Sequence, residues 1–392
     1  MRTTLRKGLF LLAGALLALG ASAAVNFEVK GVVAHQRYPW NGKVDIDFTL
    51  ASSDSAAEFK VTAACTDHVG NTNIAMRTIR YDDKETVATN FILKAGTHRL
   101  TWDADVDLPN CKLPSVSFVV FAHSPSVTET AEYLVIDLSG GADADSYPAT
   151  TLADVPTGGW TDEYKTTKLV LRRCPAGADP LGRYTLTKDF YAGVFEVTEK
   201  QWKLVMGTNP SYDKRGDTYP VEQVSYNDIR GSELGAKWPS SAAVDATSFI
   251  GRLRAKTGLN ELDLPTEAQW EFACRAGTTT EYNTGDDETA LAAAGWYSGN
   301  SNGQKHPAGE KLANAWGLYD MHGNVWEWCL DWHAWDEPSG TNPAGAASGS
   351  RRRHRGGSWN FDADRATSSY RSNGAPSNAY SNLGFRLFRT LP

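Results

Sequence analysis

The stretch Gly317-Leu-Tyr-Asp-Met-His-Gly-Asn-Val-Trp-Glu-Trp-Cys-Leu-Asp-Trp332 is denser in tryptophan, glycine and acid than an ordinary core strand or loop. Its three tryptophans can each bury a large aromatic surface, so the stretch should lie at the centre of a folded domain. Asp320 and Glu327 supply oxygen atoms, and Gly323 permits a tight turn that brings them together. We therefore expect an aromatic anchor folded around a small cation.

The composition is that of a globular protein larger than one core usually serves. The chain has 392 residues, of which 41% are hydrophobic and 22% charged, so two domains are expected. The formal net charge of -7 argues against a nucleic-acid binder held by phosphate contacts. The basic run Arg351–Arg355 is interpreted as a solvated loop.

Met1–Ala24 has the pattern of a secretory signal peptide. Basic residues precede the apolar run Leu9–Leu19, and small residues follow it at a suitable cleavage site. No later stretch of the sequence could cross a bilayer, so we expect no membrane span after signal removal. The sequence predicts a secreted, periplasmic or cell-surface protein.

Five cysteines are present, and export would make disulfides possible. Cys65 and Cys111 are the only two in the first half and are predicted to pair. Cys174, Cys274 and Cys329 leave an odd thiol, and the sequence does not choose among their pairings. No cysteine or histidine spacing indicates zinc.

From residue 25 to 138 the chain shows short apolar runs separated by turn residues. Val44-Asp-Ile-Asp-Phe-Thr-Leu50 alternates apolar and polar residues, which suits a sheet with one solvated face. We expect an all-β immunoglobulin-like sandwich with a role in adhesion, spacing or docking. The predicted strands are Phe27–Val33, Val44–Leu50, Phe59–Ala64, His98–Trp102, Val116–Ala122 and Tyr133–Leu138.

Residues 139–159 are rich in Gly, Asp and Pro and are interpreted as a linker before a second domain, 160–392. Strands are expected at Tyr184–Phe190 and Phe195–Val197, and a final one at about Gly384–Phe388. Thr198 and Thr266 each begin a capping box and should start a helix, and a further helix is expected at about Ala242–Lys256. The rest of this domain should be loops rich in glycine and tryptophan.

Six blocks of the second domain, in order and spacing, resemble the formylglycine-generating-enzyme or sulfatase-modifying-factor family. The resemblance implies an α+β fold of C-type-lectin-like kind with much irregular structure, following the β-sandwich in a multi-domain protein. The blocks are Phe195–Thr198, Pro220–Val224, Leu264–Ala273, Gly317–Trp332, Arg355–Trp359 and Asn382–Arg386.

Enzymes of this family oxidise a sulfatase cysteine to formylglycine with copper(I) held by two cysteines. The family places those cysteines between the last two blocks, and residues 359–381 here contain none. Copper(I) selects soft thiolates, so copper is not expected and the resemblance implies no catalytic residues. His306 and His322 are interpreted as hydrogen-bonded structural histidines rather than a catalytic pair.

The resemblance does imply a structural calcium ion. The family's ligands, side-chain oxygens and backbone carbonyls, fall here on Asp320, Gly323, Val325 and Glu327. The alternative is that the two acids merely cap turns or pair with arginines.

The family's peptide groove would be lined here by residues that combine aromatic contact with adaptable hydrogen bonds, as binding loops do. They are Trp359, Asn360, Asp362, Asp364, Tyr370, Arg371, Asn373 and Asn378. The alternative for each is a solvated loop residue, with Trp359 in the core.

The first hypothesis for function is a non-catalytic, calcium-stabilised module that binds protein, peptide or glycan. The second is a formylglycine-generating-type oxidase or other divergent enzyme acting on a protein. A third is a cell-surface adhesion component centred on the sandwich. Family membership alone does not choose among them, because function resides in the site.

Overall fold

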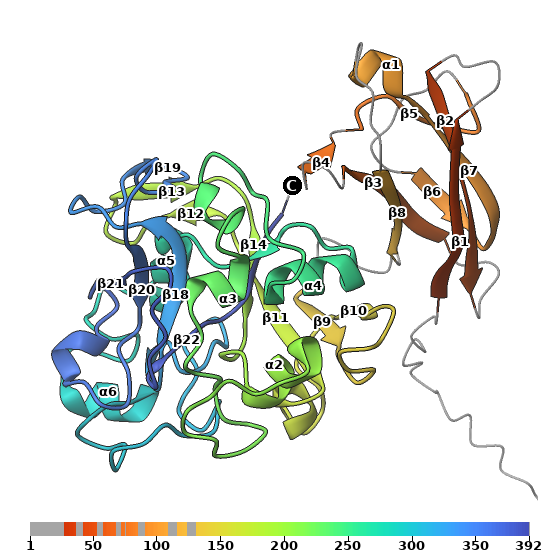
Figure 1. Ribbon diagram of the computed structural model, residues 1–392. Helices are drawn as coiled ribbons and strands as arrows, with labels where there is room; N and C mark the ends of the chain where they lie inside the picture. Colours follow the sequence, from red (N-terminus) through yellow and green to blue (C-terminus); the bar gives the residue numbers. More distant parts are fainter. Residues whose placement is uncertain are drawn as a thin grey trace, which may run out of the picture.

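The computed structural model describes residues 27–36, 42–52, 58–67, 72–74, 76–84, 91–108, 116–123 and 131–391. Figure 1 shows strands β1 to β8 in one lobe and the later elements in another. The expected signal peptide, Met1–Ala24, lies outside the described residues. Within them, no helix is long and apolar enough to cross a membrane.

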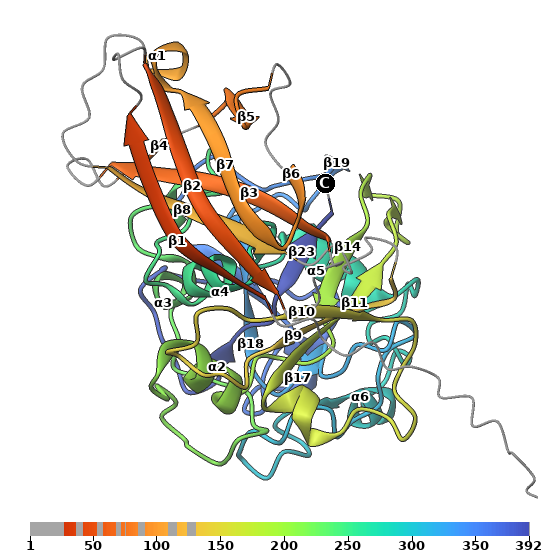
Figure 2. The same cartoon turned by 90° about the vertical axis from the view of Figure 1, so that its right-hand side faces the viewer.

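The first lobe consists of two antiparallel sheets that share one core. One has the order β1-β2-β7-β5, and in the other β3 pairs with β4, β6 and β8. The predicted alternation holds in β2, where Ile46, Phe48 and Leu50 are buried. Figure 2 shows β1, β2 and β7 running side by side. The elements are β1 Phe27–Gln36, β2 Lys43–Ser52, β3 Glu58–Asp67, β4 Thr72–Ile74, β5 Ile79–Tyr81, β6 Phe91–Lys94, β7 Gly96–Asp103, α1 Ala104–Asp107 and β8 Val116–His123.

Two sheets around one core agree with the expected β-rich domain, while an immunoglobulin topology stays a prediction. Cys65 is buried in this core. Its expected partner Cys111 lies outside the described residues, so their disulfide also stays a prediction.

The domain boundary differs from the one predicted. The run expected to end the sandwich forms β9 (Tyr133–Asp137), which pairs with β11 (Lys168–Cys174) of the second domain. The expected linker contains β10 (Ala149–Leu152), which pairs with β9. A short apolar run indicates a strand but not the sheet that it joins, because its partners are distant in sequence. Both strands belong to a six-stranded sheet of order β10-β9-β11-β14-β23-β15, whose remaining members are β14 (Phe190–Gly193), β23 (Phe388–Thr390) and β15 (Leu262–Asp263).

The capping-box helices form where they were predicted. Thr198 and Thr266 cap α2 (Glu199–Met206) and α5 (Glu267–Arg275), each with its glutamine three residues later. Helix α4 (Phe249–Thr257) begins later than predicted, because the Ser248 hydroxyl accepts from the backbone N of Gly251 and caps it there. The sequence reading missed α3 (Tyr226–Arg230) and α6 (Glu288–Ala294).

The other elements of the second domain are short. The strand predicted at Phe195–Val197 does not form. The last strand, predicted at about Gly384–Phe388, is divided into β22 and β23, because the chain passes from one sheet to another between them. The strands are β12 Gly177–Ala178, β13 Tyr184–Leu186, β14 Phe190–Gly193, β15 Leu262–Asp263, β16 Gly295–Trp296, β17 His322–Gly323, β18 Trp326–Trp332, β19 Gly340–Thr341, β20 Arg352–Arg355, β21 Ser372–Gly374, β22 Leu383–Gly384 and β23 Phe388–Thr390; 3-10 turns are η1 Asp162–Lys165, η2 Gly235–Lys237 and η3 Ala363–Ala366.

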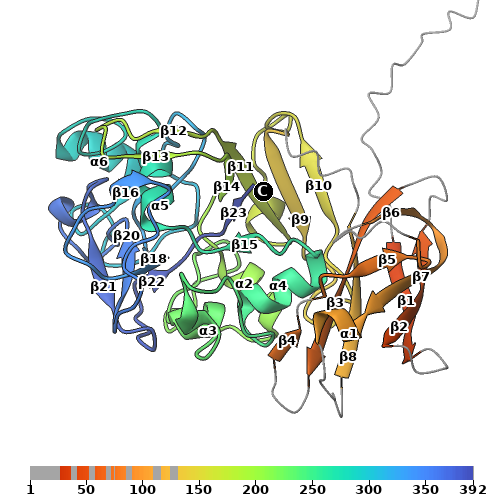
Figure 3. The same ribbon diagram turned by 90° about the horizontal axis from the view of Figure 1, so that it is seen from above.

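Strand β18, from the Trp-rich stretch, lies inside a four-stranded sheet of order β21-β20-β18-β22. All seven of its residues are buried, as the sequence predicts for a central anchor. Figures 1 and 3 both place this sheet on the side of the second lobe away from β1 to β8.

Candidate functional site

The two faces of the sheet β21-β20-β18-β22 have different chemistry. Because side chains alternate along a strand, Trp326 and Trp328 of β18 lie on one face and Glu327 on the other. Strand β20 follows the same pattern, with His354 opposite Trp328 and Arg355 opposite Glu327. One face is therefore aromatic, and the other carries buried charge.

The aromatic face forms the floor of a groove of about 670 Å³. Each of the four strands contributes a lining residue, and loops before α3 and after β20 provide the walls. This volume falls within the range of ligand-binding clefts. The lining residues are Tyr212, Gln223, Trp326, His354, Asn360, Phe361, Arg365, Ser372, Asn373, Ala379, Tyr380, Ser381, Asn382 and Leu383.

Of the eight residues that the sequence placed in a groove, Asn360 and Asn373 line this one. Trp359 is half-buried and donates its indole N–H to the carbonyl of Ser381 at 3.4 Å. Asn378 acts indirectly, donating from Nδ2 to the Tyr380 hydroxyl at 2.7 Å.

The other four residues of that set surround the groove without lining it. Asp362 accepts from the Ser298 hydroxyl at 2.8 Å, and Asp364 is exposed. The Tyr370 ring packs 5.8 Å from that of Trp326. Arg371 reaches the charged face of the sheet, where it binds the carboxylate of a buried glutamate.

His354 is the lining residue that sequence reasoning missed most clearly, because it lies in the basic run interpreted as a solvated loop. The run instead contains the buried strand β20. His354 is 6% exposed, and burial lowers its pKa to about 3, so the ring is neutral. Its Nδ1 is buried and makes no hydrogen bond within 3.5 Å, although the backbone of Asn373 acts on the ring and partly offsets the lowering of its pKa.

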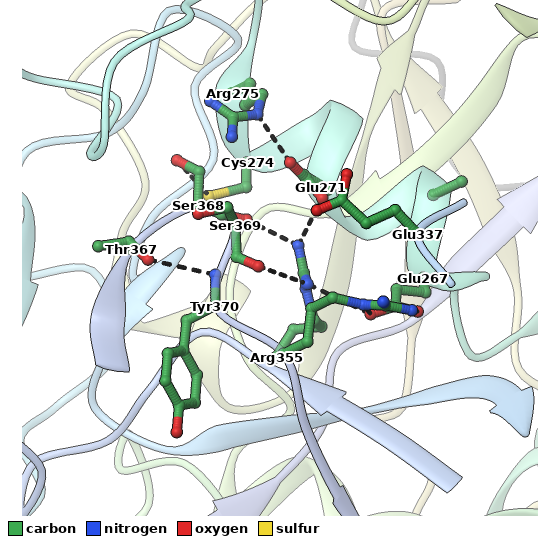
Figure 4. Close-up of polar contacts among 12 residues, drawn as sticks. Glu267, Glu271, Cys274, Arg275, Glu337, Arg355, Thr367, Ser368, Ser369 and Tyr370 are labelled. Atoms are coloured by element: carbon green, nitrogen blue, oxygen red, sulfur yellow. Dashed lines mark hydrogen bonds and ion pairs between the residues drawn. The ribbon is translucent and has the colours of Figure 1, made fainter. Parts of the chain in front are cut away.

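Arg355 holds the charged face together (Figure 4). Its guanidinium donates to Glu267 Oε1 at 3.2 Å and to Glu271 Oε2 at 2.7 Å. It also donates to the carbonyls of Ser368 at 2.7 Å and Ser369 at 3.1 Å. Arg355 thereby connects α5 to the loop that forms one groove wall, and its burial makes the connection stiff.

The three cysteines of this domain are buried, unbridged and outside the groove. Cys274 lies 3.7 Å from both the Ser368 hydroxyl and His322 Nε2. Burial raises the pKa of all three thiols, that of Cys274 to about 12. Each is therefore a protonated core thiol and a poor metal ligand. The cysteines are Cys174, Cys274 and Cys329.

The two candidate histidines occupy separate structural positions. His306 stacks on Trp296 with ring centroids 3.6 Å apart, and its Nε2 is 2.8 Å from the carbonyl of Ser301. His322 places Nδ1 2.7 Å from the carbonyl of Ala366. Each is hydrogen-bonded within the fold, as predicted.

A buried acidic cluster lies on the charged side of β18. It comprises Glu196, Asp320 and Glu327 around one cation, Arg386, and none is more than 1% exposed. Arg386 Nη2 binds Glu327 Oε1 at 2.6 Å. Burial, Asp320 and Glu327 raise the pKa of Glu196 well above its ordinary value, and burial raises that of Asp320 to about 6. One guanidinium among three carboxyl groups leaves the cluster short of positive charge.

Asp320 is the member of this cluster that fits a metal ligand. Its Oδ2 accepts from the backbone N of Gly309 at 2.6 Å, whereas Oδ1 is buried without a partner. Both oxygens of Glu327 already accept hydrogen bonds from side chains. Among the described residues no three His, Cys, Asp or Glu side chains form a metal site. Backbone carbonyls, such as those of Gly323 and Val325, would have to complete a calcium site.

The protein has two lobes, and the second carries a groove whose floor is one aromatic face of a four-stranded sheet. Residues 155–391 match the family described as "Sulfatase-modifying factor enzyme 1-like domain". The chain belongs to this family, and its formylglycine-generating-enzyme resemblance is confirmed.

Relatives of known name share parts of this domain. "Chaperone protein LppX" of Paenibacillus barcinonensis is 32% identical over 215 residues, 46% of this chain and 73% of that protein. The formylglycine-generating enzyme of Mus musculus is 35% identical over 211 residues, 48% of this chain and 49% of the enzyme. "Serine/threonine-protein kinase pkn1" of Chlamydia caviae is 38% identical over 128 residues, 31% of this chain and 20% of the kinase. The chain thus spans about half of the mouse enzyme and a fifth of the kinase.

Solved structures also align with the chain. Treponema denticola variable protein 1 aligns with a TM-score of 0.49 and 27% identity, over 59% of this chain and 97% of that one. PvdO from Pseudomonas aeruginosa aligns with a TM-score of 0.46 and 25% identity, over 57% of this chain and 94% of that one.

Proposed function

We propose that the second domain is a non-catalytic binding module whose groove receives a protein, peptide or glycan ligand. The observation that supports this proposal is the groove itself, which has an aromatic floor, amide-rich walls and a buried histidine nitrogen that makes no hydrogen bond within 3.5 Å. Such a surface offers rigid contact area and adaptable hydrogen bonds.

The chemistry of the thiols supports binding over copper-dependent oxidation. A copper(I) site needs two thiolates facing a substrate, and the groove lining, all within the described residues 131–391, contains no sulfur. The buried cysteines hold their protons at neutral pH because desolvation disfavours the thiolate.

Calcium enters the proposal as a structural ion. Asp320 would bind it through the unpartnered Oδ1, together with the carbonyls of Gly323 and Val325, while Glu327 stays paired with Arg386 and contributes charge. The ion would offset the negative charge of the cluster and so stabilise the turn that precedes β18.

The proposed binding protein is exported, and its first lobe has a supporting role. The basic and apolar pattern of Met1–Ala24 supports export to the periplasm, cell surface or medium. The β-rich first lobe would then act in spacing or docking.

The test is a binding screen of the purified protein against peptide and glycan arrays. Tyr380→Ala and Asn373→Ala remove groove contacts from partly exposed positions, and Lys203→Ala on the exposed side of α2 is the matched control. We expect binding that both groove variants weaken and the control does not. Conversion of a sulfatase-derived cysteine peptide to its aldehyde, detected by mass spectrometry, would instead establish the oxidase alternative.

A further inference from the structure

The groove has one charged side chain, and that charge has no partner. Among its lining residues, all within the described range 131–391, Arg365 is the only one that is ionised at neutral pH, since His354 is neutral. Arg365 is exposed and makes no side-chain hydrogen bond or ion pair with any described residue. Its guanidinium lies 5.1 Å from the ring centroid of Phe361 and 5.8 Å from that of Tyr370.

A guanidinium held against aromatic rings is oriented, and its planar fork matches the two oxygens of a carboxylate. Its complement is a ligand that carries an anionic group.

The amide side chains of the groove also present donors. Asn360 Oδ1 accepts from the Ser358 hydroxyl at 2.9 Å and from Asn382 Nδ2 at 2.8 Å. Asn373 Oδ1 accepts from Arg351 Nη1 at 3.0 Å. The amide nitrogens of Asn360 and Asn373 donate to no described residue, so both remain available. The groove therefore suits a ligand rich in acceptors.

The groove presents acceptors as well as donors. The side-chain amides of Gln223 and Asn382 also line it, and their carbonyl oxygens accept from no described residue. A sugar hydroxyl both donates and accepts, so a glycan can satisfy the donors and the acceptors of the groove alike.

The rim supplies flat aromatic surface. Tyr212 is 81% exposed and Tyr380 51% exposed, and both line the groove. A tyrosine ring can cover the apolar C–H face of a sugar ring while its hydroxyl bonds the polar edge.

We propose that the ligand is an acidic glycan, with the carboxylate of a uronic acid residue bound to Arg365. The inference rests on the proposed binding function and names its ligand class. The carboxylate oxygens accept from Arg365, the sugar hydroxyls pair with the side-chain amides of the groove, and the pyranose faces pack on the rim tyrosines.

Calorimetry with uronic acid hexasaccharides, prepared from pectin, alginate and hyaluronan, tests this with the full chain. The methyl ester of each oligosaccharide keeps its shape and removes its charge. We expect at least one acid form to bind and its ester to bind about tenfold to a hundredfold more weakly. Arg365→Gln should weaken the acid form by a similar factor and leave the ester unchanged, with Lys203→Gln as the control.

Arg365 is exposed, so its substitution should leave the fold intact, which circular dichroism checks. Equal binding of acid and ester, an unchanged Arg365→Gln variant, or no binding to any acidic oligosaccharide would overturn the inference. Binding of an array peptide that Tyr380→Ala abolishes would overturn the glycan assignment while leaving the groove's binding function intact. Loss of groove-dependent binding to every ligand class would refute both.

Discussion

Replacing Asp320 with asparagine should separate the two ways in which the acidic cluster can be stabilised, by a proton or by calcium. The side chain is 1% exposed, and its Oδ1 has no hydrogen-bond partner. Asp320→Asn removes the charge and keeps an oxygen to accept from the backbone N of Gly309.

The size of the effect follows from the pKa. Burial is the largest cause that raises the Asp320 pKa from 3.8 to about 6, so the folded protein holds this proton more tightly than the unfolded chain. The resulting stabilisation is full below about pH 3.8 and is lost as the pH rises through about 6. The difference corresponds to roughly 3 kcal/mol. In calcium-free buffer near neutral pH, Asp320→Asn should recover much of this lost stability. Each kcal/mol recovered should raise the Tm by about 2–4 °C.

Thermal unfolding with calcium and with EDTA, at about pH 5 and about pH 7.5, is the assay. Calcium should stabilise the wild type more at the higher pH, because a protonated Asp320 cannot act as an anionic ligand. The variant should be insensitive to calcium, and Asp364→Asn, at an exposed acid, should behave as wild type. A wild type indifferent to calcium near pH 7.5, with a variant that is less stable in EDTA, would refute this reasoning.

Three further outcomes are expected. Arg355→Met removes the guanidinium that joins Glu267 to Glu271 and should destabilise the domain by about 1–3 kcal/mol in urea unfolding, because its hydrogen bonds to charged groups are lost while each carboxylate keeps other arginine partners. A loss below about 1 kcal/mol would contradict its central role. Gly384→Ala places a Cβ 2.4 Å from the carbonyl of Val221 and should lower the unfolding free energy by roughly 1–3 kcal/mol; unchanged stability would show that the backbone there adjusts. Cys274 and Cys329 should resist iodoacetamide in the native state and react after denaturation, as mapped by mass spectrometry; rapid native labelling would reopen a copper site.

Much of the fold could be predicted from local signals. Thr198 and Thr266 start helices because a capping box is complete within four residues. Strand β18 is buried because the large aromatic surfaces of its tryptophans are most stable away from water. The basic run Arg351–Arg355 was wrongly interpreted as a solvated loop, since Arg352–Arg355 form a buried strand. Its charges are buried because partners from α5 and distant loops reach them, and no short window of sequence contains those partners.

The candidate site divides in the same way. Asn360 and Asn373 were found because they lie in the interval between the last two family blocks, where the resemblance places a groove. Tyr212 and Gln223 were missed because they reach the groove from a loop more than 130 residues earlier in the chain, and Tyr380 was missed although it lies in the same interval. The missing thiol pair was already evident in the sequence, since residues 359–381 contain no cysteine.

The sequence by itself determined the family, the capped helices and the buried aromatic strand, because each depends on residue types at fixed spacing. Only the tertiary structure decided which sheet β9 joins, which face of β18 lies in the groove, and that the Arg365 side chain makes no ion pair with a described residue. Those properties depend on what lies opposite a side chain in space, and distant segments of the chain provide it, as when Arg386 donates to the carbonyl of Gly193, 193 residues earlier.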